Sequence, residues 1–140
     1  MAHKVLVVDS SVIVKWLNRD DEANLAQSDR VFSAGRSGRV ELVTPELAKY
    51  ETGNALLNKG LDLPAAIASL SVIYTIPMSF LTIDSELAGR TLEIATQSKM
   101  SYYDATFVAL AEKLDATLVT DNPKHQAKVK GVKVVALKDY

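Results

Sequence analysis

Short aliphatic runs alternate with longer segments of helical periodicity along this chain, and this alternation restricts the fold more than any other sequence feature. Most runs are apolar at consecutive positions, as in strands that are covered on both faces of a sheet. Strands that alternate with helices predict an α/β fold with a mainly parallel sheet. The expected strands are Val5–Val8, Val40–Thr44, Phe80–Ile83, Thr117–Thr120 and Val132–Leu137, and the expected helices are Ser11–Leu17, Glu22–Ala34, Pro45–Lys59, Pro64–Tyr74, Ser85–Gln97, Tyr102–Leu114 and Pro123–Lys128.

Composition narrows the class of protein. A length of 140 residues, 48% of them hydrophobic, suits one domain over residues 1–140 with a substantial core. The net charge of −1 gives no global positive field, so a nucleic-acid partner has to be bound by a local patch. The absence of cysteine excludes disulfides, thiol catalysis and zinc–thiolate sites. Since the N-terminus does not resemble a signal peptide and no apolar stretch approaches the ~20 residues that span a bilayer, we expect a cytoplasmic protein without membrane contact.

Asp9 follows the first predicted strand directly. In open parallel sheets, ligands bind beyond the carboxyl ends of the strands. Ser10 or Ser11 can cap the helix that follows, which leaves the carboxylate of Asp9 available. We therefore expect Asp9 to be a functional residue.

Asp121 stands at the end of the strand Thr117–Thr120, where Thr120 adds a hydroxyl group. Asn122 before Pro123 is a ready pair for the cap and first position of a helix. Asp121 is therefore not needed as a cap, and we expect it to be a second acid at the edge of the sheet.

Two further acids are predicted on helices. Glu51 shares a helical face with Leu47 and Ala55, with Asn54 beside them, so it lies either at the edge of the buried face or inside a site. Asp104 precedes an apolar stripe at helical spacing. Asp104 also lies three residues after Ser101, a capping-box spacing, and one residue can both cap a helix and face a cleft.

Four carboxylates are each expected at a strand end or on an inward helix face, and no histidine or arginine has a comparable position. They are Asp9, Glu51, Asp104 and Asp121. Carboxylates in one cleft stay ionised only if a cation neutralises them. Oxygen ligands without nitrogen or sulfur favour Mg²⁺ or Mn²⁺ over zinc. The sequence therefore predicts that these four acids are catalytic residues and metal ligands.

A lysine-rich segment extends from Asn122 to Lys138 and contains no acid. Such a segment is either a solvated surface or a contact for the phosphate backbone of a nucleic acid. Lys124 is the strongest candidate for substrate binding, because it lies closest to Asp121.

The stretches "VLVVDSSVIVKWL", "TPELAKYETGNAL", "SYYDATFVALAEKLDATLVTDNPKH" and "GVKVVAL" resemble the PIN-domain family, in particular toxin-type nucleases of the VapC kind. The resemblance implies a three-layer α/β/α sandwich and a Mg²⁺- or Mn²⁺-dependent endoribonuclease that leaves a 5′-phosphate and a 3′-hydroxyl. It implies that Asp9 and Asp104 are the principal metal ligands, and it matches Ser10 or Ser11 to a hydroxyl residue beside the first acid. It also implies RNA as substrate, a homodimer and a VapB-type antitoxin as a possible partner.

The sequence departs from the family pattern at the fourth acid. Many relatives have Thr-x-Asp at this strand end, whereas this chain has Thr120-Asp121-Asn122. Either Asp121 supplies the carboxylate, or Asn122 replaces it as a neutral ligand. This departure favours an alternative function, a catalytically weak or inactive PIN-like module that binds RNA or protein. The three other acids, each in place, favour the ribonuclease.

Overall fold

A parallel sheet of five strands forms the centre of the computed structural model, which describes residues 4–140. The strand order is β3-β2-β1-β4-β5, and every pair of neighbours is parallel. β1 is central because its residues Leu6, Val7 and Val8 are fully buried and accept neighbours on both edges. The strands are β1 (Lys4–Val8), β2 (Val40–Pro45), β3 (Ser79–Leu81), β4 (Thr117–Thr120) and β5 (Val134–Ala136).

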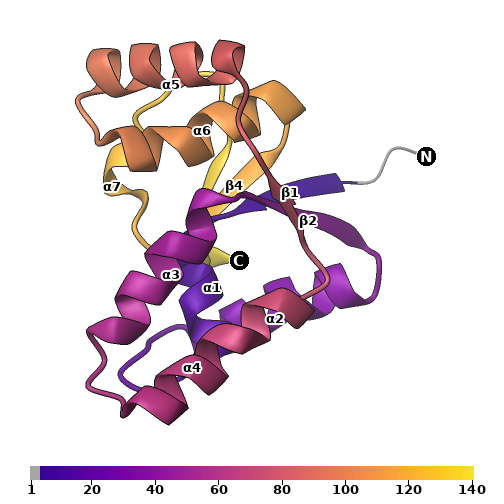
Figure 1. The fold of residues 1–140 in the computed structure, drawn as a ribbon. Helices are drawn as coiled ribbons and strands as arrows, with labels where there is room; N and C mark the ends of the chain where they lie inside the picture. Colours follow the sequence, from indigo (N-terminus) through magenta and orange to yellow (C-terminus); the bar gives the residue numbers. More distant parts are fainter. Residues whose placement is uncertain (1–3) are drawn as a thin grey trace.

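Helices cover both faces of the sheet (Figure 1). The pair α5 (Ser85–Ser98) and α6 (Tyr102–Leu114) packs on one face. The other face carries α1 (Ser10–Leu17), α2 (Leu25–Arg36) and α3 (Leu47–Leu57), with α4 (Leu63–Ser71) and the short 3₁₀ helix η1 (Val72–Thr75) outside them. The predicted three-layer α/β/α sandwich is therefore confirmed. The chain closes with α7 (Pro123–Gln126), β5 and the 3₁₀ helix η2 (Leu137–Asp139).

The core extends over both faces of the sheet, and on one face it lies between the sheet and the buried side of α6. Phe107, Val108 and Ala111 of α6 are fully buried against it, together with Leu118 of β4. Burial of one such large apolar side chain contributes about 1.5–3 kcal/mol. This packing fixes α6 on the sheet and so determines where the first turn of α6, with Asp104, lies.

Element boundaries agree with the sequence prediction where the signals were local. The strand Thr117–Thr120 and the helix Tyr102–Leu114 have the predicted bounds. Pro45 was expected to begin a helix, and this expectation is wrong. Pro45 ends β2 opposite Leu81, and the following Glu46 N–H still donates to the Leu81 carbonyl at 2.8 Å, so α3 begins only at Leu47.

Several other elements are shorter than predicted, among them β3, α4 and α7. The helix expected from Glu22 begins at Leu25, because Asn24 adopts the left-handed conformation with φ of 56°. The last strand spans only Val134–Ala136, and Leu137 already belongs to η2. Part of the N-terminal segment considered for a signal peptide, residues 1–3, lies outside the described residues. Within residues 4–140, the helices are all too short or too polar to cross a membrane.

Candidate active site

The candidate site lies where the strand order reverses. The chain leaves β1 toward β2 and β3 on one side and later returns to β4 on the other. Ligands of open α/β sheets bind at such a point, beyond the carboxyl ends of the strands. Asp9 follows β1 and Asp121 follows β4, so the topology brings these two sequence-predicted acids to the same edge.

Asp9 is held by donors on both carboxylate oxygens. Oδ2 accepts from the Ser11 amide at 3.1 Å and from the Ser11 hydroxyl at 2.6 Å. Oδ1 accepts from the Gln126 amide at 3.2 Å. Asp9 is thus itself the cap of α1, contrary to the expectation that a serine fills that role. The side chain is only 8% exposed, and burial raises the pKa of Asp9, with a smaller contribution from the charge of Asp104, despite these hydrogen bonds.

Glu51 extends from α3 toward the same edge. The Ser10 hydroxyl donates to its Oε1 at 2.7 Å, which fixes the half-buried carboxylate beside the start of α1. Burial raises the pKa of Glu51, and the charges of Asp9 and Asp104 raise it further. The three acids are therefore close enough to repel one another. The sequence left two positions open for Glu51, and the structure places its carboxylate beside Ser10 at the start of α1.

Asp104 lies on α6, on the face of the sheet opposite α3. It is the third residue of α6, where its amide donates to the Ser101 hydroxyl at 3.0 Å, as the capping spacing predicted. Gln126 links this turn to Asp9, because its amide also donates to the Asp104 carbonyl at 3.2 Å. Gln126 is 2% exposed and was not predicted. Within the lysine-rich segment, no pattern distinguishes it from a surface residue.

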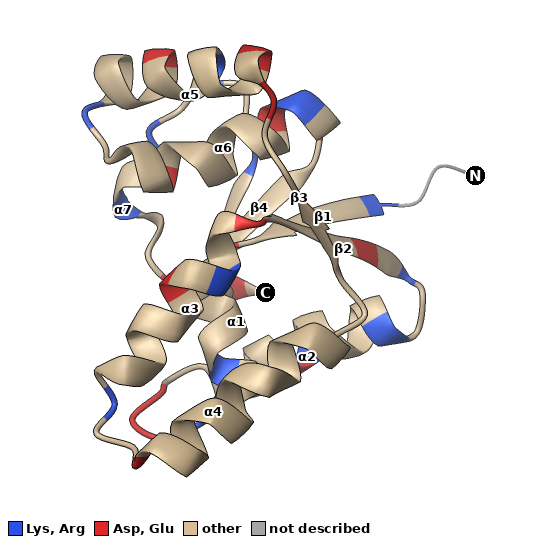
Figure 2. Ribbon diagram, viewed as in Figure 1, with Lys and Arg blue, Asp and Glu red and all other residues tan. Residues whose placement is uncertain are grey.

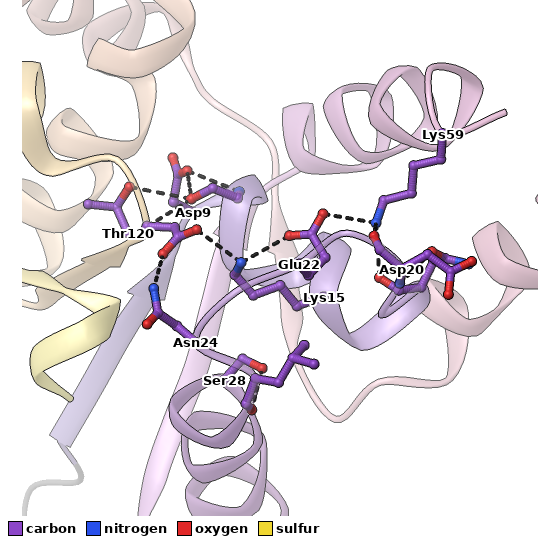
Figure 3. Close-up of polar contacts among 12 residues, drawn as sticks. Asp9, Lys15, Asp20, Glu22, Asn24, Ser28, Lys59 and Thr120 are labelled. Atoms are coloured by element: carbon purple, nitrogen blue, oxygen red, sulfur yellow. Dashed lines mark hydrogen bonds and ion pairs between the residues drawn. The ribbon is translucent and has the colours of Figure 1, made fainter.

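Asp121 has a different environment from the other three acids. Its Oδ2 pairs with the Lys15 ammonium at 2.9 Å, and its Oδ1 accepts from the Asn24 amide at 3.0 Å. Lys15 also pairs with Glu22 at 2.9 Å, and Glu22 pairs with Lys59 at 2.8 Å (Figure 3). The structure therefore places the carboxylate of Asp121 in a chain of alternating charges.

Lys15 is the cation at the centre of this chain and is only 1% exposed. Burial by itself lowers the pKa of Lys15, but its hydrogen bonds and charge pairing with Asp121 and Glu22 outweigh burial and raise the pKa. Sequence reasoning missed Lys15. A signal was present, because Lys15 interrupts the apolar run "VIVKWL" just as Asp9 follows "VLVV".

The predicted supporting residues have unequal positions. The Ser11 hydroxyl accepts from the Asp121 amide at 3.0 Å, and the buried Thr120 hydroxyl accepts from the Asn122 amide at 3.1 Å. The side chain of Asn122 is exposed, and so is Lys124 on α7. Among all predicted site residues, the structure brings together Asp9, Glu51, Asp104, Ser10 and Ser11. The Thr120 hydroxyl lies 3.5 Å from that of Ser11. Three predicted residues are exposed at the periphery of the site: Asn54, Asn122 and Lys124.

The chemistry of the donors fits a hard divalent cation. The charge of Asp104 adds to the cost of ionising Asp9 and Glu51, and a cation removes that cost. In the described part of the chain, no three Asp, Glu or His side chains are already arranged to coordinate a metal ion together. Mg²⁺ usually keeps several waters and takes only one or two carboxylates directly, so its binding does not require such a cage.

Comparisons with known proteins define the family. The model of the PIN domain matches residues 6–132, so the chain belongs to the PIN-domain family. The chain is 30% identical over 97 residues to exonuclease VapC9 of Pyrobaculum aerophilum, a match that covers 66% of this chain and 71% of that protein.

Solved structures that share the fold include the following two. A toxin–antitoxin complex from Klebsiella pneumoniae aligns with a TM-score of 0.71 at 14% identity and covers 96% of this chain and 99% of that one. VapC20 of Mycobacterium tuberculosis, described as a toxin that cleaves the sarcin–ricin loop, aligns with a TM-score of 0.63 at 20% identity and covers 81% and 86%. Both likenesses support the α/β/α architecture.

Proposed function

We propose that this chain is a divalent-metal-dependent endoribonuclease and the toxin of a toxin–antitoxin pair. The observation that carries the proposal is the convergence of Asp9, Glu51 and Asp104 at the switch point of the sheet, with the pKa of Asp9 and of Glu51 raised. The family membership, the nuclease relative and the RNA-cleaving toxin of the same fold support it.

Asp9, Glu51 and Asp104 are the residues that would hold Mg²⁺ or Mn²⁺. When bound, such an ion lowers the pKa of water and neutralises charge on a phosphodiester. Ser11 and Gln126 hold the carboxylate of Asp9 in place, and Ser10 holds that of Glu51. Glu51, whose carboxylate Ser10 holds at this edge, would orient or deprotonate the attacking water. Asp121, with its charge balanced by Lys15, supports the edge of the site in this account.

An apolar surface outside the catalytic site supports the proposed protein partner. Leu57 of α3 and Leu63 and Ile67 of α4 are 77%, 70% and 57% exposed. Figure 2 shows that the ribbon of α4 carries no charged residue, and an exposed apolar patch of this kind often marks a protein interface. We propose that a VapB-type antitoxin covers this surface. We also propose, from the family resemblance, that the chain forms a homodimer, which light scattering of the purified protein tests.

RNA cleavage tests the proposed activity. The purified chain is incubated with linear and circular single-stranded RNA in Mn²⁺, in Mg²⁺ or in EDTA, and Asp9→Asn and Asp104→Asn serve as matched variants. We expect metal-dependent cutting of both RNAs that both variants lose. Cutting of linear RNA alone would indicate an exonuclease, the activity in the name of VapC9. If RNA is bound but never cut, the alternative function as a binding module is favoured.

A further inference from the structure

A groove of about 440 Å³ opens beside the carboxylate cluster, on the side of α3 and the start of α6. Its volume lies within the ~300–1,000 Å³ range of pockets that hold small ligands. Glu51 forms part of its wall, so whatever enters the groove lies next to the proposed catalytic acids. The lining residues are Leu47, Tyr50, Glu51, Asn54, Ala55 and Tyr103.

The two tyrosines of the groove are its most unusual feature. Tyr50 and Tyr103 are 72% and 58% exposed, although tyrosine rings normally bury most of their apolar surface. Each ring directly precedes one of the acids in sequence, Tyr50 before Glu51 and Tyr103 before Asp104. The rings therefore come from two helices on opposite sides of the sheet and line a single groove at the catalytic edge.

The charge of the groove restricts its ligand. Among residues 4–140, neither lysine nor arginine lines it, so these residues offer a phosphate group no cationic partner there. Flat aromatic rings stack on nucleobases whatever the base, and the exposed amide of Asn54 offers a donor and an acceptor to a base edge. A wholly apolar peptide segment fits less well, because it would enclose the carboxylate of Glu51 and add no donor to the one hydrogen bond that Ser10 gives to Oε1.

We propose that this groove binds an unpaired nucleobase of the RNA substrate, stacked on Tyr50 or Tyr103, next to the phosphodiester that is cut. The inference rests on the proposed ribonuclease function and adds a class of substrate to it. Bases inside an A-form helix are stacked on one another and do not reach such a groove. The site therefore favours RNA that is single-stranded, looped or bulged at the cut.

Cleavage kinetics and base fluorescence test the proposal together. The chain, Tyr50→Ala and Tyr103→Ala are assayed in Mn²⁺ on single-stranded RNA that carries 2-aminopurine beside the cut. Loss of a stacked base costs about 1–3 kcal/mol, so we expect the KM of an alanine variant to rise about 5- to 150-fold. Tyr50→Phe and Tyr103→Phe should retain both the low KM and the quenching of 2-aminopurine. Tyr74→Ala removes a tyrosine that is 69% exposed outside the groove, and it should leave KM unchanged.

Each result bears on the proposal. Unchanged KM and unchanged quenching in both alanine variants would overturn the base site and leave the ribonuclease standing, and the groove would then be free for a protein partner. Absence of RNA cutting by the unmodified chain would overturn the ribonuclease and the base site together. Equal thermal stabilisation of all variants by Mn²⁺ shows that the carboxylate cluster is intact, so a raised KM is then due to the rings.

Discussion

At the scale of single residues, the candidate site separates its acids by the partners they have. Within the described residues, the hydrogen bonds that Asp9 and Glu51 accept all come from neutral groups, whereas Asp121 is paired with the ammonium of Lys15. Burying a lysine is costly, and its charge pairs offset that cost. Lys15 thereby secures the end of β4 to α1 and keeps the charge of Asp121 balanced without a metal ion.

Replacing Lys15 should therefore be strongly destabilising. Lys15→Met leaves Asp121 and Glu22 without their shared cation, and because these two acids are 24% and 18% exposed, we expect a loss of about 3 kcal/mol, the lower end for a broken buried pair. Urea unfolding gives the value. The control is Arg19→Met, which breaks the exposed pair with Asp29 and should destabilise the fold far less, because solvent screens an exposed pair. Similar losses in the two variants would show that the buried pair has no special role.

The same difference between the acids predicts an order of metal affinities. Asp104→Asn should weaken Mn²⁺ binding far more than Asp121→Asn does, because Lys15 already neutralises Asp121. Titration calorimetry with Mn²⁺ measures both. If Asp121→Asn abolishes binding, Asp121 is a direct ligand and the site has the four acids that the sequence alone suggests.

The sequence predicted these acids better than it predicted their partners. Asp9 and Glu51 interrupt apolar patterns, and such an interruption is visible without coordinates. Gln126 could not be found in this way, because its contacts to Asp9 and Asp104 depend on how α7 folds back at the end of β4. Lys15 interrupts an apolar pattern too, so the rule that found the acids extends to buried cations.

At the scale of elements, an ion pair joins α5 and α6. Arg90 of α5 donates to both carboxylate oxygens of Glu112 on α6, at 2.7 and 2.9 Å. These hydrogen bonds lower the pKa of Glu112. This contact therefore helps to hold α6, the helix on which Asp104 lies, against α5.

Acidification should reveal the contribution of Glu112. Because its pKa is lowered in the folded chain, Glu112 stabilises the fold fully above its unfolded pKa of about 4.3, and that contribution is lost as the pH falls through the folded pKa. We expect the chain to melt higher than Glu112→Gln at pH 7 and the difference to shrink below about pH 4.3. Melting temperatures across this pH range measure it. A difference that is constant with pH would mean that the carboxylate charge does not stabilise the fold.

Element boundaries were predictable where the signal was local. The helix Tyr102–Leu114 follows from the Ser101 cap and from its apolar stripe, both within a few residues of each boundary. The start of α3 was not predictable, because proline is a common first residue of helices. The place of Pro45 at the end of β2 depends on its pairing with β3, which the sequence does not show. Leu137 likewise continues an apolar run in sequence but leaves the sheet for η2.

At the scale of the whole molecule, parallel topology concentrates the chemistry. The acids stand 95 residues apart between Asp9 and Asp104, and a sheet with α6 packed on β1 is what brings them to one edge. The proposed base groove lies beside this edge, and the apolar face of α3 and α4 lies outside it. The proposed RNA site and the proposed protein interface therefore occupy different surfaces.

The central claim, that the carboxylate cluster binds a divalent cation, is tested most directly by thermal unfolding with and without Mn²⁺. A ligand that binds only the folded state stabilises it by about 2.7 kcal/mol at a concentration one hundred times its Kd. We predict that Mn²⁺ raises the melting temperature of the chain and not that of Asp9→Asn. No rise for the unmodified chain, or an equal rise for both proteins, would contradict the account.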